Sequence, residues 1–363
     1  MTKSPVPHST PVCVPCRLAA IGAVVLALAG GFAYTAGWLT SARLTAPRLI
    51  DTFEKVAGKP HPGFRRNHAK GLCVSGYFDS NGDGAVLSHA AVFTVGRTPV
   101  TGRFAVPGGN PSAPDTSVPV RSMALLFQLN NGEQWRTGMN STPVFAVHTP
   151  EQFYRQLLAS QPDPATGKPD PAKIKAFYAA NPETQPFRAW VQAHPPSSSL
   201  ANAAYYGINA FRFTDATGTT RAVRWAMVPE TPYAPITDAQ KSAKNFLQAD
   251  LDQRLQNGPL RWHLILTVAQ PGDPTDDATL QWPDNRQHID AGTLVLEQTS
   301  SQEDGACRDV NFDPTVLPAG ISPSDDPLLA ARSAAYALSY KRRTREEALH
   351  PELHRTQTSG DRS

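Results

Sequence analysis

Residues 327–340 read PLLAARSAAYALSY, and their pattern predicts a helix. Leu328, Leu329, Arg332 and Tyr336 recur at the spacing of one helix face. Arg332 and Tyr336 are four residues apart, so a helix places the guanidinium and the phenol on the same side. Core packing is the ordinary role of such a tyrosine. The arginine adds a second role, because a nearby guanidinium lowers the pKa of a phenol and favours the phenolate.

Upstream of this helix, short apolar runs alternate with clusters of Gly, Asn, Asp and Pro, which predicts strands joined by turns. Thr149 and Gln152 form a capping box, so a helix is expected to begin there and to reach about Leu158. Further helices are expected at 45–60, 170–180, 185–193 and 238–256, and strands at 73–78, 91–95, 123–129, 144–147, 205–213, 222–228, 262–268 and 292–296. This order predicts an α+β fold: an antiparallel β-barrel or large sheet with inserted and C-terminal helices.

The length suggests one large domain or two ordinary ones, and the composition argues against several classes of protein. Hydrophobic residues make up 40% of the 363 residues, which is ample for a core, and 34 prolines spread along the chain argue against a helical bundle or solenoid. A formal net charge of +3 gives no reason to expect a nucleic-acid partner. Four cysteines are too few for a disulfide scaffold.

The N-terminal region carries one long apolar run. Residues 18–39 contain no charged side chain, and about 20 apolar residues suffice to cross a bilayer as a helix. This length favours an uncleaved transmembrane anchor over a cleaved signal, and basic residues on both flanks leave the orientation open. We therefore expect an N-terminal segment (1–17), a membrane anchor (18–39), an exported domain (45–345) and a polar tail (346–363), with secretion after signal cleavage as the alternative.

Two local motifs invite a metal or redox interpretation. The loop DSNGDG at 79–84 imitates a calcium-binding loop, but its twelfth position is Ala90 where a glutamate is needed, so a turn is predicted. Cys13 and Cys16 form an isolated CxxC motif that is interpreted as incidental. Cys73 and Cys307 both lie in the part expected to be exported, so an oxidising compartment permits a disulfide between them.

Six motifs follow one another in order between residues 50 and 345. They are RRNHAKG at 65–71, RF at 103–104 with DT at 115–116 and Arg121, NSTPVF at 140–145, DPT at 273–275 with WP at 282–283 and GTL at 292–294, NFDP at 311–314 with LP at 317–318, and the 324–343 helix region with Arg332, Tyr336 and Arg343. Together they resemble the haem catalase superfamily. The likeness is greatest to the catalase-related peroxidases, or mini-catalases, which often carry an N-terminal membrane anchor.

The resemblance implies a catalase-like β-barrel around heme b and a role for each matching residue. It implies that Tyr336 is the axial ligand of the haem iron and that Arg332 holds it as phenolate. His68 is implied as the general base and then acid toward the peroxide, and Asn140 as the donor of a hydrogen bond to it. The arginines implied as partners of the haem propionates are Arg65, Arg103 and Arg343.

Two departures from the family shape the expected activity. Many catalases carry a serine after the RF pair that hydrogen-bonds the distal histidine, whereas this chain has Ala105, so His68 needs another partner. The expected domain also lacks room for the N-terminal arm and C-terminal helical domain of full catalases, which implies a more accessible haem. We expect a peroxidase that reduces organic hydroperoxides, and hydrogen peroxide more weakly, with an unidentified external electron donor. The alternatives are a hydroperoxide isomerase or lyase on the same haem site and a non-enzymatic haem-binding module.

Overall fold

The computed structural model describes residues 14–36 and 44–349 of the 363-residue chain. The chain forms two compact units, divided between Thr45 and Ala46. In the first, helix α1 (Val14–Thr35) is long and apolar enough to cross a membrane, a test that a signal sequence also passes. It begins before the expected span of 18–39, whose last residues lie outside the described part of the chain.

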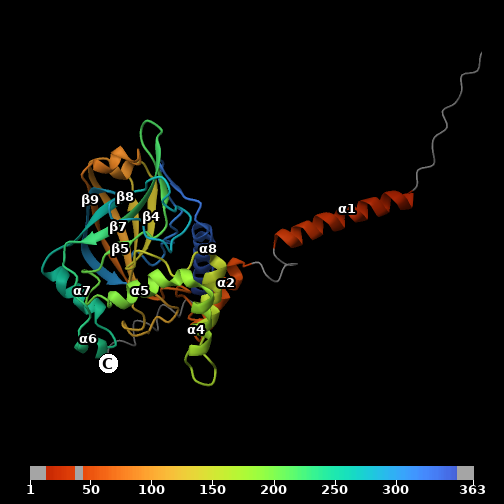
Figure 1. Cartoon of the computed structure of the whole chain (residues 1–363), viewed down its shortest axis with the longest axis horizontal. Coiled ribbons are helices and arrows are strands. Elements are labelled where there is room, and N and C mark those ends of the chain that lie inside the picture. The colour runs from red at the N-terminus through yellow and green to blue at the C-terminus, as the bar shows by residue number, and fades with distance from the viewer. Residues whose placement is uncertain (1–13, 37–43, 350–363) are drawn as a thin grey trace, which may run out of the picture. The chain divides into compact units, whose positions relative to one another are not determined.

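The second unit is built on a closed antiparallel barrel (Figure 1). Eight strands form a ring in the order β7-β5-β4-β3-β2-β1-β9-β8, and the pairing of β7 with β8 closes it. Strands β6 and β10 extend the sheet beyond β7. The bounds are β1 Lys70–Ser80, β2 Gly96–Val106, β3 Ser122–Gln128, β4 Gln134–Asn140, β5 Tyr205–Tyr206, β6 Phe211–Thr214, β7 Thr220–Pro229, β8 Leu260–Val268, β9 Gln287–Ser301 and β10 Ile321–Pro323.

Seven helices accompany the barrel, and the longest is the C-terminal α8 (Pro327–Leu349). Helices α2, α4 and α8 gather on one flank of the barrel in Figure 1, and α6 and α7 lie near one end. The capping box predicted at Thr149 is present at the start of α3. The remaining bounds are α2 Ala46–Val56, α3 Pro150–Ala159, α4 Pro171–Ala180, α5 Gln185–Ala193, α6 Asp238–Ser242 and α7 Leu247–Gln256, with short 3-10 turns at η1 Asp83–Val86, η2 Ala91–Phe93 and η3 Pro182–Thr184.

The barrel interior is an apolar core made by alternate residues of each strand. Strand β8 reads LRWHLILTV, and every second residue from Leu260 to Val268 is buried. Aromatic rings fill the centre: Trp135 stacks on Phe127 with ring centroids 4.9 Å apart and meets Trp225 edge-on at 5.1 Å. Residues between the inward positions face outward and do not contribute to this barrel core.

Several expected elements differ in the structure. Residues 91–95 and 144–147 are not strands: most of their apolar side chains are buried, and periodicity alone does not distinguish a buried turn from a strand. The strands at 96–106 and 134–140 were not predicted, because Pro, Gly and Arg interrupt their alternation. The expected helix at 238–256 is two helices, α6 and α7.

The start of the polar tail also needs correction, because α8 continues to Leu349. Glu346 forms an ion pair with Arg66, whose Nε donates to Glu54 on α2 at 2.7 Å. These contacts tie α8, α2 and the 65–71 segment together, so the residues from 346 to 349 belong to the folded domain. The remainder of the expected tail lies outside the described residues.

The calcium-like loop is a turn, as predicted: Asp83 opens the 3-10 turn η1 between β1 and β2. Within the described ranges, no cluster of His, Cys, Asp and Glu has the make-up of a metal site.

Candidate active site

A cavity in the second unit lies against the outer face of β2, β3 and β4, and α2, α3 and α8 contribute to its other walls. All of the residues predicted for the site line this one cavity: Arg65, His68, Arg103, Asn140, Arg332, Tyr336 and Arg343. They come from a loop before β1, from two strands and from α8. The fold therefore brings together residues from both ends of the domain.

Helix α8 supplies Arg332 and Tyr336 to the cavity, one turn apart. Gly138 on β4 faces both: a Cβ there would lie 2.8 Å from Arg332 Nη2 and 3.2 Å from Tyr336 Oη. The missing side chain thus lets the phenol and the guanidinium approach the barrel wall closely. No described residue hydrogen-bonds the Tyr336 hydroxyl, so its oxygen remains available to a ligand in the cavity.

Arg332 is held by two hydrogen bonds that the sequence did not predict. Its Nη1 donates to Asn209 Oδ1 at 2.6 Å and its Nη2 to the Gly138 carbonyl at 2.7 Å. Asn209 Nδ2 in turn donates to Asp326 Oδ2 at 2.7 Å, and burial raises the pKa of Asp326. Ile208, which precedes Asn209, has a φ of 65°, a backbone conformation rare for a β-branched residue and kept where the surrounding structure demands it.

His68 enters the cavity from a strained loop before β1. Its φ is 59°, and its backbone N–H donates to Asn67 Oδ1 at 3.0 Å; the same oxygen accepts from Gly108 N at 2.8 Å. The backbone at His68 is thus held in place, whereas no described residue hydrogen-bonds the imidazole, so the partner missing at Ala105 is not replaced by another described residue. Burial, followed by the charges of Arg103, Arg332 and Arg65, lowers the pKa of His68 to about 3. The imidazole is therefore neutral at physiological pH and able to accept a proton.

Asn140 is the last residue of β4 and lines the same cavity. Its Oδ1 accepts a hydrogen bond from Ser122 Oγ at 2.8 Å. Ser122 was not among the predicted site residues, although it directly follows Arg121 of the second motif. Only the pairing of β3 with β4 reveals that it lies opposite Asn140.

Three guanidinium groups, those of Arg65, Arg103 and Arg343, lie together at the cavity rim. Burial lowers the pKa of each, and their mutual repulsion lowers that of Arg65 and Arg103 further, to about 9 for Arg103. Arg103 Nη2 donates to Gln302 at 2.6 Å, but the buried Nε atoms of Arg103 and Arg343 have no hydrogen-bond partner among the described residues. Arg343 Nη1 also lies 3.5 Å from Asp309 and 3.6 Å from Glu347, so part of the charge is balanced. The two unpartnered Nε–H donors suit an anionic ligand.

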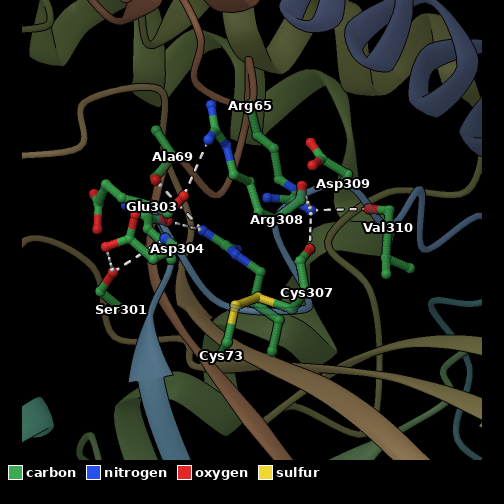
Figure 2. Close-up of a disulfide and its surroundings, with 12 residues drawn as sticks. Arg65, Ala69, Cys73, Ser301, Glu303, Asp304, Cys307, Arg308, Asp309 and Val310 are labelled. Atoms are coloured by element: carbon green, nitrogen blue, oxygen red, sulfur yellow. Dashed lines mark hydrogen bonds between the residues drawn. A yellow bond between two sulfur atoms is a disulfide. The ribbon is translucent and has the colours of Figure 1, made fainter. Parts of the chain in front are cut away.

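Arg65 is fixed by a loop that a disulfide attaches to the barrel (Figure 2). Its Nη2 donates to the carbonyls of Cys307 at 3.0 Å and Val310 at 2.9 Å. Cys307 is bonded to Cys73 of β1, with the Cα atoms 5.3 Å apart, so the disulfide that the sequence left open is present. Cys73 lies beside Arg103 in the sheet register. The disulfide therefore links the loop whose carbonyls accept hydrogen bonds from Arg65 to strand β1, which pairs with the strand that carries Arg103.

The remaining wall of the cavity is apolar. Leu49, Ile50 and Phe53 of α2 line it, together with Phe145 and Phe153. Phe153 packs against both Phe53 and Phe145, with ring centroids 5.8 and 5.4 Å apart. This cluster surrounds the polar groups with a surface that favours apolar molecules.

These residues fit a haem. A phenol without a hydrogen-bond partner can serve as an axial ligand, and the rim arginines with unsatisfied Nε atoms can neutralise two carboxylates. A neutral imidazole and a carboxamide lie in the same cavity for the chemistry of a small substrate.

Sequence comparison places the chain among peroxide-metabolising proteins. The sequence model of the catalase family matches residues 44–350. The chain is 42% identical to the catalase-related peroxidase of Synechococcus elongatus, covering 83% of this chain and 89% of that protein. It is 32% identical to the catalase-related peroxidase of Mycolicibacterium paratuberculosis, covering 84% and 96%. With the catalase of Vibrio vulnificus the identity is 27%, and the match spans 62% of that protein.

Solved structures show the same fold. Catalase A from Saccharomyces cerevisiae superposes with a TM-score of 0.72 at 21% identity, covering 78% of this chain and 62% of that one. A fungal catalase gives a TM-score of 0.71 at 20% identity, covering 79% and 61%. The expected catalase-like barrel is thus confirmed.

Proposed function

Because this chain belongs to the catalase family and is an oxidoreductase that acts on peroxide, we propose that it is a heme b peroxidase that reduces organic hydroperoxides with an external electron donor. Hydrogen peroxide is the weaker substrate in this proposal, and catalase activity is low. The cavity carries the proposal: it combines Tyr336, His68, Asn140 and the rim arginines with an apolar wall.

In this proposal residues of α8, β2 and the loop before β1 would hold the haem. Tyr336 Oη would bind the iron, and Arg332 lies one turn away on α8. Arg65, Arg103 and Arg343 bind the propionates, whose negative charge relieves the repulsion among the three guanidiniums. When bound, the haem iron supplies the redox chemistry that breaks the O–O bond.

His68 and Asn140 act on the peroxide itself. The neutral imidazole accepts the proton of the incoming hydroperoxide and returns it to the leaving oxygen, as general base and then acid. The Asn140 carboxamide donates a hydrogen bond to the peroxide oxygen on which charge develops. Both groups share the cavity with the haem-binding residues, so substrate and cofactor meet there.

The preference for organic hydroperoxides rests on the apolar wall formed by α2, Phe145 and Phe153. Burying apolar substrate surface there contributes roughly 25 cal/mol per Å², which hydrogen peroxide, lacking carbon, does not gain.

A peroxide panel tests this proposal. The purified protein is expected to show a Soret band and to oxidise a chromogenic donor faster with cumene hydroperoxide than with hydrogen peroxide, as kcat/KM. Reaction without a donor, followed by product analysis, separates reduction from isomerisation or cleavage. A protein without a Soret band, or one that prefers hydrogen peroxide and releases oxygen rapidly, would contradict the proposal.

For location, we propose that α1 anchors the enzyme in a membrane and that the catalytic domain is exported. The disulfide between Cys73 and Cys307 supports this, since such bonds persist in oxidising compartments. Cell fractionation followed by protease treatment tests it: the haem domain should remain with the membrane fraction and be accessible from the outside.

A further inference from the structure

Ser122 occupies an unusual place in the wall of the cavity. It is the first residue of β3, it is 7% exposed, and it contributes to the cavity lining. In the sheet register it lies directly between Ala105 of β2 and Asn140 of β4. Of these three aligned positions only Ser122 carries a hydroxyl, and that hydroxyl donates to Asn140 Oδ1 at 2.8 Å.

The orientation of the Asn140 carboxamide decides what it can do. A carboxamide has an acceptor oxygen at one end and an NH2 donor at the other, and a half-turn of the group exchanges them. With Oδ1 engaged by Ser122, the donor Nδ2 has no partner among the described residues and stays available in the cavity. The reverse orientation would present an acceptor, which cannot stabilise negative charge on a peroxide oxygen.

We propose that Ser122 is a positioning residue that fixes the Asn140 carboxamide with its Nδ2 donor toward the bound peroxide. This inference rests on the proposed peroxidase function and extends it. It also distinguishes the two polar groups of the site: only the backbone of His68 is hydrogen-bonded, whereas the side chain of Asn140 itself has a hydrogen-bond partner among the described residues.

Substitutions in the full-length, haem-loaded protein test the inference. Ser122→Ala is expected to lower kcat/KM for cumene hydroperoxide about 5–10-fold, as for the loss of one hydrogen bond, and Asn140→Ala about 100-fold. Ser122→Thr keeps the hydroxyl and should stay within about twofold of the wild type. Ser141→Ala is the matched control, because Ser141 also bonds between these strand ends, to Arg121 N at 2.9 Å, without touching the Asn140 side chain.

A double-mutant cycle separates positioning from a general structural role. In the Asn140→Ala background, Ser122→Ala should lower the rate by less than about twofold, because the group on which it acts is gone. An unchanged 5–10-fold loss in that background would overturn the inference. So would a rate loss in Ser141→Ala equal to that in Ser122→Ala, since the effect would then come from weakened strand ends.

An infrared spectrum provides a readout independent of turnover. In the ferrous protein with bound carbon monoxide, loss of a nearby hydrogen-bond donor raises the C–O stretching frequency. Ser122→Ala should move part of the band to the higher frequency found in Asn140→Ala, and Ser122→Thr should not. A wild-type protein without a Soret band overturns the proposed function together with this inference. Wild-type turnover with an unaffected Ser122→Ala overturns only this inference.

Discussion

The two faces of strands β2, β3 and β4 differ sharply in composition. Inward residues such as Phe104, Phe127 and Trp135 are fully buried and apolar, and they form the barrel core. The outward-facing residues that line the cavity are small or polar instead: Arg103, Ala105, Ser122, Ala124, Gly138 and Asn140. Successive side chains of a strand point to opposite faces, so one set of residues packs the core and the other set faces the cavity.

This separation predicts that outward substitutions change haem binding and turnover, whereas inward substitutions change the free energy of unfolding. Outward residues lose little packing when replaced, because the cavity already lies beside them. Inward residues contact other core side chains on every side, so their removal leaves an empty volume.

The largest effect is expected from Tyr336→Phe, which removes only the cavity-facing oxygen. Haem binding should weaken by more than the roughly 10–100-fold that loss of an outer partner of a metal ligand costs. Haem titration followed by the Soret band measures this. Tyr340→Phe is the matched control on the same helix and the same cavity. Equal haem affinity in Tyr336→Phe and the wild type would refute the ligand assignment.

His68→Gln should lower kcat/KM for peroxide by about 10²–10⁴-fold, the usual contribution of a general acid–base group. His61→Gln, a nearby histidine outside the cavity lining, should leave the rate unchanged.

The pH profile of the wild type tests whether His68 is unprotonated over the working pH range. With a pKa near 3, His68 stays unprotonated as the pH falls from 8 to 5, so its function as a base is retained over that range. The rate per haem should accordingly be flat there, and an acid limb with a midpoint near 6.5 that disappears in His68→Gln would contradict the lowered pKa.

Trp135→Ala tests the inward face. It removes a ring that stacks on Phe127 and contacts Trp225, and the free energy of unfolding should fall by about 3–5 kcal/mol. Urea unfolding measures the loss, and the milder Trp135→Phe should lose less. The rate per bound haem should change by less than about threefold, since the side chain points away from the cavity. A larger rate loss would mean that the two faces are coupled.

The smallest effect is expected from removing the disulfide with Cys73→Ser and Cys307→Ser together. Stability should fall by about 2–4 kcal/mol, as for other native disulfides. Haem should also dissociate faster, because the loop whose carbonyls hold Arg65 loses its attachment to β1. Transfer of haem to an acceptor protein measures this rate, and an unchanged rate would show that the loop holds Arg65 without the disulfide.

The sequence alone determined several local elements and named the residues that are proposed for the site. The spacing of Leu328, Arg332 and Tyr336 predicted α8, and the Thr149–Gln152 capping box predicted α3, because these signals act within one or two helical turns. The six ordered motifs named every predicted member of the site, and the structure brings all of them to one cavity.

Only the tertiary structure decided which residues support that site. Ser122, Asn209 and Gly138 act through strand register and through contacts between β4, the loop after β5 and α8. The same holds for the closure of β7 on β8 and for the extension of α8 past Glu346, which depends on Arg66. The physical reason is that hydrogen bonds and packing between distant segments form only when the barrel closes. The hydrophobic periodicity of a single segment therefore cannot predict them.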